Sequence, residues 1–352
     1  MVNAPAFLGQ IASRVDSRLQ TLLEGETKRW SQLDPDLAAP FDELSRLVLL
    51  GGKHLRSAFC FLGFIGAGGD PSENRIIDAG AAIELLHACA LFHDDVIDGS
   101  ATRRGVPTTH TARARQHEAS NWAGESRRFG EGVAILVGDL AFVYADQLLA
   151  DAPPPVWKIW NELRLELNIG QYLDLLGTAQ SDRRRTKAER ISRYKSGKYT
   201  IERPLHLGAL LANPAIAEEF LVALSAYGLP LGDAFQMRDD VLGAFGDSST
   251  TGKPVGDDLR EGKPTPLLAI AIDRANTSQR KVLQLVGKTQ LSDAQVADVQ
   301  QAIRKTGALE EIEAHINSLT ETAVDAARLA PITQEARDGL IQLATFVSWR
   351  EV

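Results

Sequence analysis

A long apolar stretch that ends in a cluster of acids limits what this chain can fold into. Asp70-Pro71-Ser72-Glu73 is typical of a helix start, with a capping Asp, Pro at the first position and an acid in the first turn. From there apolar residues recur every three or four positions to Asp98, which predicts a helix of about 28 residues, roughly 42 Å long. Because a helix this apolar belongs in a core, we expect the acids at its end to have a function.

The rest of the chain has the same helical pattern, and alternating strand-like runs are scarce. Residues 116–132 are polar and broken by Gly124 and Gly130, which favours a flexible surface insertion. No repeat, low-complexity linker or shift in composition divides residues 1–352, so we expect one all-α domain built as a single large helical bundle. The periodicity predicts further helices at 38–50, 52–66, 132–150, 155–177, 189–211, 215–243, 265–285, 293–306 and 308–328.

Composition indicates a globular, mildly acidic protein of the cytoplasm. Hydrophobic residues make up 44% of the chain and the formal net charge is −8, which argues against general nucleic-acid binding. Cys60 and Cys89, the only cysteines, lie in apolar surroundings and are interpreted as buried hydrophobic residues. Residues 1–19 lack the basic segment of a signal peptide. We expect no transmembrane segment, and the nearest approach to one is at residues 57–66.

The first acidic motif is His93-Asp94-Asp95-Val96-Ile97-Asp98. Asp94 and Asp98 share a helix face about one turn apart, and Asp95 is rotated from that face by about 100°. Carboxylates this close repel one another unless a cation lies between them. Mg²⁺ takes one or two carboxylates together with waters and substrate phosphates, so the motif predicts a magnesium site for a phosphate-bearing ligand. The alternative is an acidic helix end on a solvated surface.

The second acidic motif is the pair Asp239-Asp240, near the end of another apolar helical stretch. Gln236 lies three and four residues before the two acids, so the three side chains point the same way. Alone, an acidic pair after an apolar helix is a weak signal. Together with the first motif it indicates a second place where a metal ion binds.

Basic residues accompany the acids. Lys53 and Arg56 share one face at the start of a predicted helix, directly after Gly51-Gly52, which favours binding of an anion. The alternative is a glycine turn with two solvated cations. Arg103-Arg104 follows the first acidic motif within a few residues.

Further cations lie in the second half of the chain. Lys198 belongs to the run Lys195-Ser196-Gly197-Lys198-Tyr199-Thr200. The loop at 246–266 carries Lys253 among glycines and prolines. Long loops in compact domains are usually functional or disordered, and glycines with lysines favour a lid over phosphate groups.

These residues form an ordered set of motifs that resembles one family, the trans-isoprenyl diphosphate synthases or polyprenyl synthetases. The resemblance covers nearly the whole chain from about residue 46. The amino-acid sequence of these motifs is similar to that of actinobacterial geranylgeranyl diphosphate synthases, and so is the extra segment after His110. The motifs are Gly-Lys-x-x-Arg at 52–56, His-Asp-Asp-x-x-Asp at 93–98, Arg-Arg-Gly at 103–105, Gly-Asp at 138–139, Gly-Gln-x-x-Asp at 170–174, Phe-Gln-x-x-Asp-Asp at 235–240 and the glycine- and lysine-rich run at 252–263.

The resemblance implies a helical bundle of the isoprenoid synthase type with a central apolar cavity, assembled as a homodimer. It implies a Mg²⁺-dependent prenyltransferase that joins isopentenyl diphosphate to an allylic diphosphate (dimethylallyl, geranyl or farnesyl). Two magnesium ions would bind at Asp94, Asp95 and Asp98, and a third at Asp239 and Asp240. The allylic diphosphate would contact Arg103, Lys198, Gln236 and Lys253, and isopentenyl diphosphate would contact Lys53, Arg56, His87 and Arg104. The acids, Arg103 and Lys198 are the expected catalytic residues.

Two positions depart from the family pattern. Gly243 stands where many relatives have a third Asp, so the third metal ion would be held more loosely or through water, with Asp247 as a candidate helper. Relatives usually have Thr directly after the lysine at 198. Here Tyr199 intervenes, and Thr200 is the candidate for that role.

The residues just before the first motif suggest the product length. Cys89 and Ala90 are small, where relatives that make the C15 product generally have an aromatic residue. Cys89 lies about 7.5 Å before Asp94 along the helix axis, so a growing apolar chain could pass this layer. We expect geranylgeranyl diphosphate (C20) as the main product, with C15 farnesyl or C25 geranylfarnesyl diphosphate as alternatives.

Two functions of other classes are considered. A class I terpene cyclase also ionises prenyl diphosphates at an acidic helix, but its second metal motif is absent, since Gly243 and Asp247 stand at the spacings where that motif has Ser/Thr and Glu. A non-catalytic partner subunit would not need to retain both acidic motifs. The sequence therefore favours the synthase.

Overall fold

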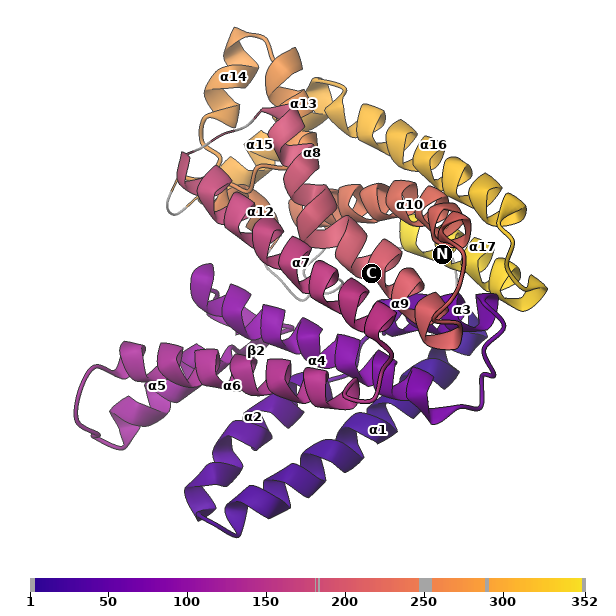
Figure 1. Ribbon diagram of the computed structural model, residues 1–352. Helices are drawn as coiled ribbons and strands as arrows, with labels where there is room; N and C mark the ends of the chain where they lie inside the picture. Colours follow the sequence, from indigo (N-terminus) through magenta and orange to yellow (C-terminus); the bar gives the residue numbers. More distant parts are fainter. Residues whose placement is uncertain (1–3, 181, 183, 247–254, 289–290, 350–352) are drawn as a thin grey trace. The chain divides into compact units, whose positions relative to one another are not determined.

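The computed structural model describes residues 4–180, 182, 184–246, 255–288 and 291–349, and these are almost entirely helical (Figure 1). The all-α prediction is confirmed. Within the described residues, the sole strand pairing is a hairpin of β1 (Thr102–Arg103) and β2 (Val106–Pro107). Residue contacts divide the chain into two compact units, each described by itself. The N-unit comprises Ala6–Phe61 and Asp70–Pro153, and the C-unit comprises Met1–Pro5, Leu62–Gly69 and Pro154–Val352. The single domain stays a prediction.

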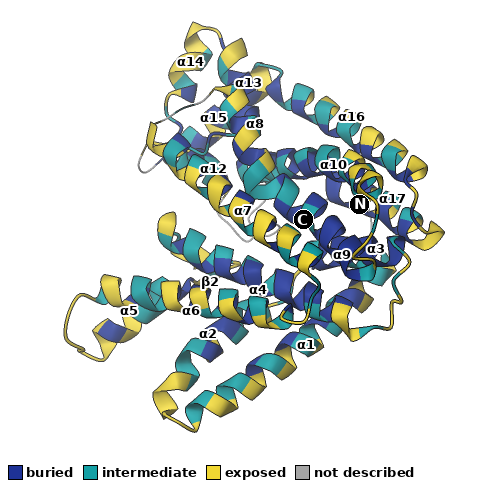
Figure 2. Ribbon diagram, viewed as in Figure 1, coloured by how far each residue is buried: buried dark blue, intermediate teal, exposed yellow. Residues whose placement is uncertain are grey.

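The N-unit is built around helix α4, which is buried along most of its length (Figure 2). Helix α4 packs mainly against α6, and α5 also packs against α6. Helix α1 buries Leu8, Ile11, Val15, Leu19 and Leu23, which recur at helical spacing and form one apolar stripe. The elements are α1 (Ala6–Ser31), η1 (Pro35–Leu37), α2 (Ala38–Val48), the start of α3 (Leu55–Gly66), α4 (Asn74–Ile97), β1, β2, α5 (Thr109–Ala119) and α6 (Ser126–Leu148).

The start of α4 differs from the prediction. The helix begins at Asn74, and Asp70 instead caps a turn, because its Oδ1 accepts a hydrogen bond from the Ser72 amide at 2.8 Å. Helix α4 is also long and apolar enough, by length and composition alone, to cross a membrane, so the expectation that no stretch reaches that length is wrong. Of its most apolar 18-residue window, 67% is buried inside the protein, as in the core helix of a globular unit.

The stretch at 116–132, expected as a flexible insertion, consists of the end of α5, a short turn and the beginning of α6. His117 is buried there and makes ring contacts with Trp122 and Phe129 at centroid distances of 5.9 and 5.3 Å. Its Nε2 lies 3.1 Å from the carbonyl oxygen of Ala123. This aromatic cluster packs the turn against the two helix ends.

The C-unit has its hydrophobic core among α10, α13, α15 and α16. Helix α10 packs against α16 and η2, and α7 packs against η2 and α9. Helix α10 runs through Pro230 without interruption. The elements are the end of α3, α7 (Pro154–Gln180), α8 (Arg185–Ser192), η2 (Arg193–Glu202), α9 (Arg203–Ala212), α10 (Glu218–Phe245), α12 (Asp257–Glu261), α13 (Pro266–Arg274), α14 (Thr277–Leu283), α15 (Asp293–Lys305), α16 (Ala308–Leu329) and α17 (Gln334–Ser348).

The predicted helix at 189–211 contains a ten-residue π-helix, η2, between α8 and α9. Wide helical turns of this kind are rare and often occur at functional sites. Glycines allow η2 to approach its neighbours closely. A Cβ on Gly232 of α10 would lie 2.7 Å from the carbonyl oxygen of Gly197, and one on Gly170 of α7 would overlap the Lys195 backbone. Side chains at Gly232 or Gly170 would therefore push α10 or α7 away from η2.

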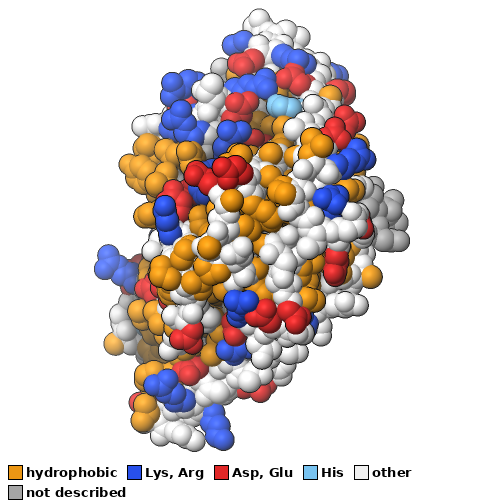
Figure 3. All heavy atoms as spheres, turned by 45° about the vertical axis from the view of Figure 1, so that its right-hand side comes forward, with side chains coloured by type: hydrophobic (Ala, Val, Ile, Leu, Met, Phe, Trp, Pro, Cys, Tyr) orange, Lys and Arg blue, Asp and Glu red, His pale blue; other side chains and the backbone are white. Residues whose placement is uncertain are grey.

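Two helices expose apolar stripes. Leu136 and Val143 on α6 are 64% and 55% exposed and lie two turns apart. On α7, Leu165, Ile169 and Tyr172 are at least half exposed and follow helical spacing. Figure 3 shows that hydrophobic side chains are also exposed among charged side chains of both signs on one face of the molecule.

Candidate active site

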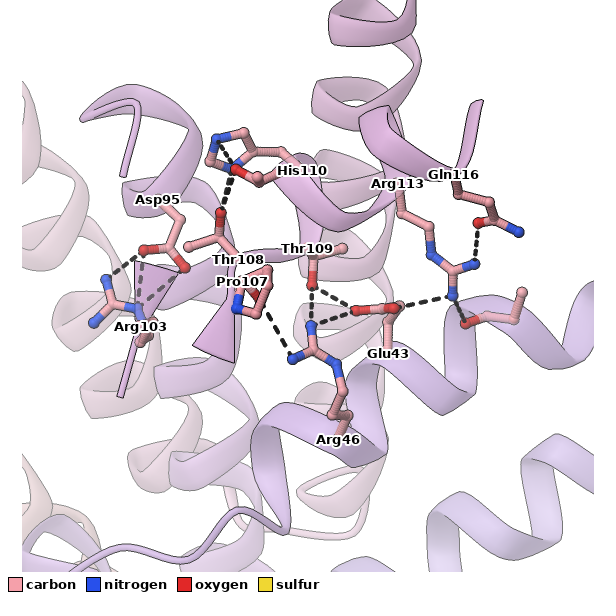
Figure 4. Close-up of polar contacts among 12 residues, drawn as sticks. Glu43, Arg46, Asp95, Arg103, Pro107, Thr108, Thr109, His110, Arg113 and Gln116 are labelled. Carbon is pink, nitrogen blue, oxygen red and sulfur yellow. Dashed lines mark hydrogen bonds and ion pairs between the residues drawn. The ribbon is translucent and has the colours of Figure 1, made fainter. Parts of the chain in front are cut away.

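The first acidic motif lies in the last turn of α4, where the three acids have different surroundings. Asp95 is 5% exposed and accepts hydrogen bonds from Arg103 Nη2 at 2.6 Å and Arg103 Nε at 2.9 Å (Figure 4). Asp94 Oδ2 lies 3.7 Å from Arg103 Nη2. Asp98 caps the helix and is exposed. No basic residue occupies this last turn, so the acids lie at the negative end of the helix dipole and favour an added cation.

The β1–β2 hairpin gives the two adjacent arginines of the Arg-Arg-Gly motif different partners. Its two turn residues, Arg104 and Gly105, both have positive φ (51° and 77°), as in the tight turns that match the twist of paired strands. Arg103 precedes the turn and contacts the acids of α4. Arg104 instead donates a hydrogen bond to the carbonyl oxygen of Gly51. Adjacent cations therefore serve different parts of the N-unit.

The segment after the hairpin is fixed to its neighbours. Thr108 Oγ1 donates to the carbonyl oxygen of Ser100 at 2.7 Å, which closes the loop after α4. Thr109 Oγ1 donates to Glu43 of α2 at 2.7 Å, and Arg113 lies 3.0 Å from the same carboxylate. These contacts hold the loop that carries Arg103.

A cavity in the N-unit is lined by His87 and Arg104, two of the four residues predicted to bind isopentenyl diphosphate. Its wall includes Gly51 and Gly52, His54, Glu84, His87 and Arg104. Lys53 lies in the exposed segment beside it, and Arg56 lies in the first turn of α3. Burial, followed by the charge of Arg56, holds the pKa of His87 well below its ordinary value, so its imidazole is neutral.

The second acidic motif lies near the end of α10, whose last turn also lacks a basic residue. Asp240 is 5% exposed, and Gln236 donates a hydrogen bond to its Oδ1 at 2.9 Å. Among the described residues, none hydrogen-bonds its Oδ2. Burial and the charges of Asp258 and Asp239 raise the pKa of Asp240 well above its ordinary value. A cation bound here would reverse that preference and keep the carboxylate ionised.

Gly243, which stands where many relatives are expected to have a third acid, lies directly beside the side chain of Asp258. A Cβ on Gly243 would overlap the carboxylate of Asp258, which begins α12 together with Asp257. The side chain of Asp258 therefore occupies the space beside Gly243. Lys263 lies 3.5 Å from Asp258 Oδ1. Asp247, the helper suggested by the sequence, lies outside the described residues, as does Lys253.

Lys198 of η2 is bound by a carboxylate that the sequence did not indicate. Its ammonium donates to Glu166 of α7, which is 5% exposed, and lies 5.3 Å from the Tyr194 ring centroid. Arg203 donates two further hydrogen bonds of 2.7 Å to Glu166, one to each oxygen. Burial alone would raise the pKa of Glu166, but Arg203 and Lys198 outweigh it and lower that pKa. Thr200, two residues after Lys198, is fully buried.

One turn earlier in η2, Lys195 pairs with Asp174 of α7 at 2.6 Å. Asp174 ends the Gly-Gln-x-x-Asp motif, and Gly170 begins it. The motif thus has two structural effects within the C-unit. Its glycine admits the η2 backbone, and its acid neutralises a lysine of η2.

The small residues expected to set product length are part of α4. Cys89 is 7% exposed, and its Sγ lies 3.8 Å from Nδ1 of His93 one turn on. Burial, together with the charge of Asp139, raises the pKa of the Cys89 thiol to about 12, so it stays protonated. Ala90 is partly exposed. His93 occupies the space beside Gly138 of α6, so a larger side chain at 89 would be added near this α4–α6 contact.

The side chains present fit a magnesium ion whose shell is completed by water and phosphate. Over the described ranges, no group of three or more His, Cys, Asp or Glu side chains is close enough to hold a metal ion alone. This fits Mg²⁺, which uses few carboxylates and completes its shell with water and substrate phosphates. The orphaned Oδ2 of Asp240 and the repulsion among Asp239, Asp240 and Asp258 also fit a bound divalent cation.

Several residues of the site could not be read from the motifs. Glu166 is one acid among many on an amphipathic helix, and only its burial marks it. His54 and Glu84 belong to helical stretches in which neither stands out. Asp258 could have been found, because a glycine at 243 leaves room for a carboxylate from the glycine-rich segment.

Comparison with known proteins identifies the chain's relatives. A family model described as Polyprenyl synthetase matches residues 39–306. The chain belongs to the polyprenyl synthetase family. A geranylfarnesyl diphosphate synthase of Aeropyrum pernix is 31% identical over 86% of this chain and 91% of its own length. A geranylgeranyl diphosphate synthase of Mycobacterium tuberculosis is 34% identical over 64% of this chain and 61% of its own length.

A solved polyprenyl synthetase has nearly the same fold. The geranylgeranyl pyrophosphate synthase of Corynebacterium glutamicum, described as complexed with isoprenyl diphosphate and magnesium, is 38% identical. The match covers 97% of this chain and 99% of that one, with a TM-score of 0.92. The predictions of the family, of its actinobacterial likeness and of a prenyltransferase acting in isoprenoid synthesis are confirmed. Relatives that make C20 and C25 products both occur.

The Glu166 cluster yields a stability prediction. Glu166→Gln keeps the shape of the side chain but removes the carboxylate that accepts hydrogen bonds from both Arg203 and Lys198 in a largely buried place, and leaves Lys198 with Glu202 at 4.0 Å as a weaker partner. We expect the free energy of unfolding, measured by urea denaturation, to fall by about 2–4 kcal/mol. Glu321→Gln, at an exposed position of α16, is the control and should change it by less than about 0.5 kcal/mol. Equal losses in both variants would show that the cluster does not stabilise the unit.

Proposed function

We propose that this chain is a Mg²⁺-dependent synthase that adds isopentenyl diphosphate to an allylic diphosphate and releases mainly geranylgeranyl diphosphate. The observation that carries the proposal is the pair of acidic motifs, each in the last turns of a long, largely buried helix with no basic residue in its last turn. Asp95 also holds Arg103, but the exposed Asp98 and the Oδ2 of Asp240, which has no hydrogen bond among the described residues, suit cations shared with a diphosphate. The C20 product rests on the small residues Cys89 and Ala90.

The acids are assigned to metal ions in two sets. Asp94 and Asp98 share a face of α4 and would hold two magnesium ions, with Asp95 supporting them from its contact with Arg103. Asp239 and Asp240 would hold a third, and Asp258 stands in for the missing third acid of that motif. Bound magnesium supplies charge that neutralises the diphosphate and stabilises it as a leaving group.

The cations are assigned to the two substrates. Lys53, Arg56, His87 and Arg104 would bind the diphosphate of isopentenyl diphosphate at the N-unit cavity. Arg103, Lys198, Thr200, Gln236 and Lys253 would bind the allylic diphosphate. Lys198 has three donors, so it can keep its bond to Glu166 and still offer a proton to a phosphate oxygen.

The reaction follows from these roles. The bond between C1 and oxygen of the allylic substrate breaks, and the electron pair leaves with the diphosphate, whose growing charge Arg103 and Lys198 stabilise. The double bond of isopentenyl diphosphate then attacks the allylic cation through its terminal carbon. C2 of the isopentenyl unit then loses a proton to the departed diphosphate, and the electron pair of that C–H bond forms the new double bond. Apolar residues of α4 would exclude water from the cation.

Assembly and location follow the family expectation. We propose a homodimer, because the stripes of Leu136 and Val143 on α6 and of Leu165, Ile169 and Tyr172 on α7 leave apolar surface that a second copy could cover. We also propose that the enzyme acts in the cytoplasm. Neither nucleic acid nor a membrane is required by the chemistry assigned to it.

Turnover tests the function directly. The purified protein with Mg²⁺, isopentenyl diphosphate and each allylic starter should release a longer prenyl diphosphate, identified by mass spectrometry. Asp94→Asn and Asp239→Asn should each lower kcat by about a hundredfold or more while circular dichroism stays unchanged, because transition-state charge stabilisation is lost. Asp36→Asn, in the exposed η1 segment, is the matched control. Near-normal turnover of both variants at saturating Mg²⁺ would refute the metal assignment.

Product length can be tested separately. Cys89→Phe should fill the layer one turn before the acids and shorten the main product from C20 towards C15, with Mg²⁺ dependence unchanged. Overpacking beside His93 could cost about 1–3 kcal/mol, so thermal unfolding is measured alongside. Cys60→Ala, in α3, controls for loss of a buried thiol. A folded, active Cys89→Phe enzyme that still makes C20 would show that this layer does not set length.

A further inference from the structure

The N-unit cavity contains an acid that its proposed ligand should repel. Glu84 of α4 lies in the cavity wall together with His87 and Arg104. Burial would raise the pKa of Glu84, but the contact and charge of His54, with help from the charge of Arg56, lower it to about 2. Glu84 is therefore ionised, and a bare carboxylate here would oppose the binding of any anion.

His54 lies between this acid and a second one. Its Nδ1 is 3.4 Å from Glu84 Oε2, and its Nε2 is 3.1 Å from Asp16 Oδ1 on α1. The His54 side chain is 3% exposed, so both contacts are shielded from water. Burial lowers the pKa of His54, but Glu84 and Asp16 outweigh both burial and the nearby Arg104 and raise that pKa above its ordinary value. The imidazole can thus carry a positive charge at neutral pH.

The backbone at His54 is adapted to this placement. Its φ is +45°, a left-handed value that is unusual for any residue except glycine. The carbonyl oxygen of His54 accepts the first hydrogen bond of α3, from the Ala58 amide at 2.9 Å. A residue with a strained backbone therefore connects Gly51-Gly52 to the helix that carries Arg56.

Glu84 is held from its other side. The Ser57 hydroxyl, in the first turn of α3, lies 2.7 Å from Glu84 Oε1 and 3.0 Å from the carbonyl oxygen of Gly80. Asp16, His54, Glu84 and Ser57 thus form one chain of contacts that connects α1, the start of α3 and α4. Two of its members, His54 and Glu84, line the cavity.

We propose that His54 is a positioning residue of the isopentenyl diphosphate pocket, which neutralises Glu84 in the wall and fixes the segment that bears Lys53 and Arg56. The inference rests on the proposed function for the identity of the ligand. It assigns to α1, through Asp16, a part in binding that substrate. The charged groups that face His54 are Asp16, Glu84 and Arg104, and the charge of Arg56 acts on Glu84.

Calorimetric titration of isopentenyl diphosphate into the protein with Mg²⁺ tests this without relying on turnover. His54→Gln should weaken binding about tenfold, because Glu84 is left uncompensated. Glu84→Gln in the His54→Gln background should restore the Kd to within about threefold of the wild type, which a purely structural role of His54 would not allow. His54→Lys, which keeps a cation, should bind nearly as the wild type does. His315→Gln, on α16, is the control.

The outcomes separate cleanly. Wild-type affinity in folded His54→Gln protein, or a double variant as weak as His54→Gln, would overturn the proposal. If the Gln variants fail to fold, the wild-type Kd at rising pH decides. It should increase as His54 loses its proton, and that increase should be absent in His54→Lys; equal pH dependence in both would overturn the proposal. A wild type that binds isopentenyl diphosphate but makes no product would instead refute the proposed function.

Discussion

Repulsion between carboxylates at the ends of long helices is the constraint on which the site depends. Helix α4 presents Asp94, Asp95 and Asp98 in its last turn, and α10 presents Asp239 and Asp240 near its own. Each set lies where the helix dipole is negative, with no basic residue in the last turn to offset it. Among these acids, Asp240 has a pKa raised well above its ordinary value by burial and by the charges of Asp258 and Asp239, so an added cation would relieve repulsion there.

Several cations of the protein are already paired with carboxylates, and Lys198 shares its carboxylate with a second cation. Some are committed to particular carboxylates, as Arg103 is to Asp95, Lys195 to Asp174 and Arg203 to Glu166. These pairs set the positions of the hairpin and of η2. Lys198 shares Glu166 with Arg203, so the buried acid would keep Arg203 as a counter-ion if Lys198 also bound a substrate, as proposed. Pairing of this kind positions charge before a ligand arrives.

The motifs predicted the helical fold, the family and which acids end up at helix ends. They did so because metal and phosphate chemistry restricts residue type and spacing within a single helix. What they could not predict depends on contacts between distant segments. Glu166 contacts Lys198 only because η2 is a π-helix that packs closely against Gly170 and Gly232. The role of Asp70 was mistaken because its side chain favours a local turn over capping α4. Helices α1 and α17 were not among the predicted helices, although the apolar residues of α1 recur at helical spacing.

The central claim is that the acids of α4 and α10 bind the metal ions of a bound diphosphate. Crystals grown with Mn²⁺ and an unreactive allylic thiodiphosphate, measured at the manganese absorption edge, test it most directly. The account predicts anomalous peaks beside Asp94 and Asp98 and beside Asp239, each about 2.0–2.3 Å from a carboxylate oxygen and shared with the diphosphate. A bound thiodiphosphate whose manganese peaks lie away from both acidic motifs would contradict it.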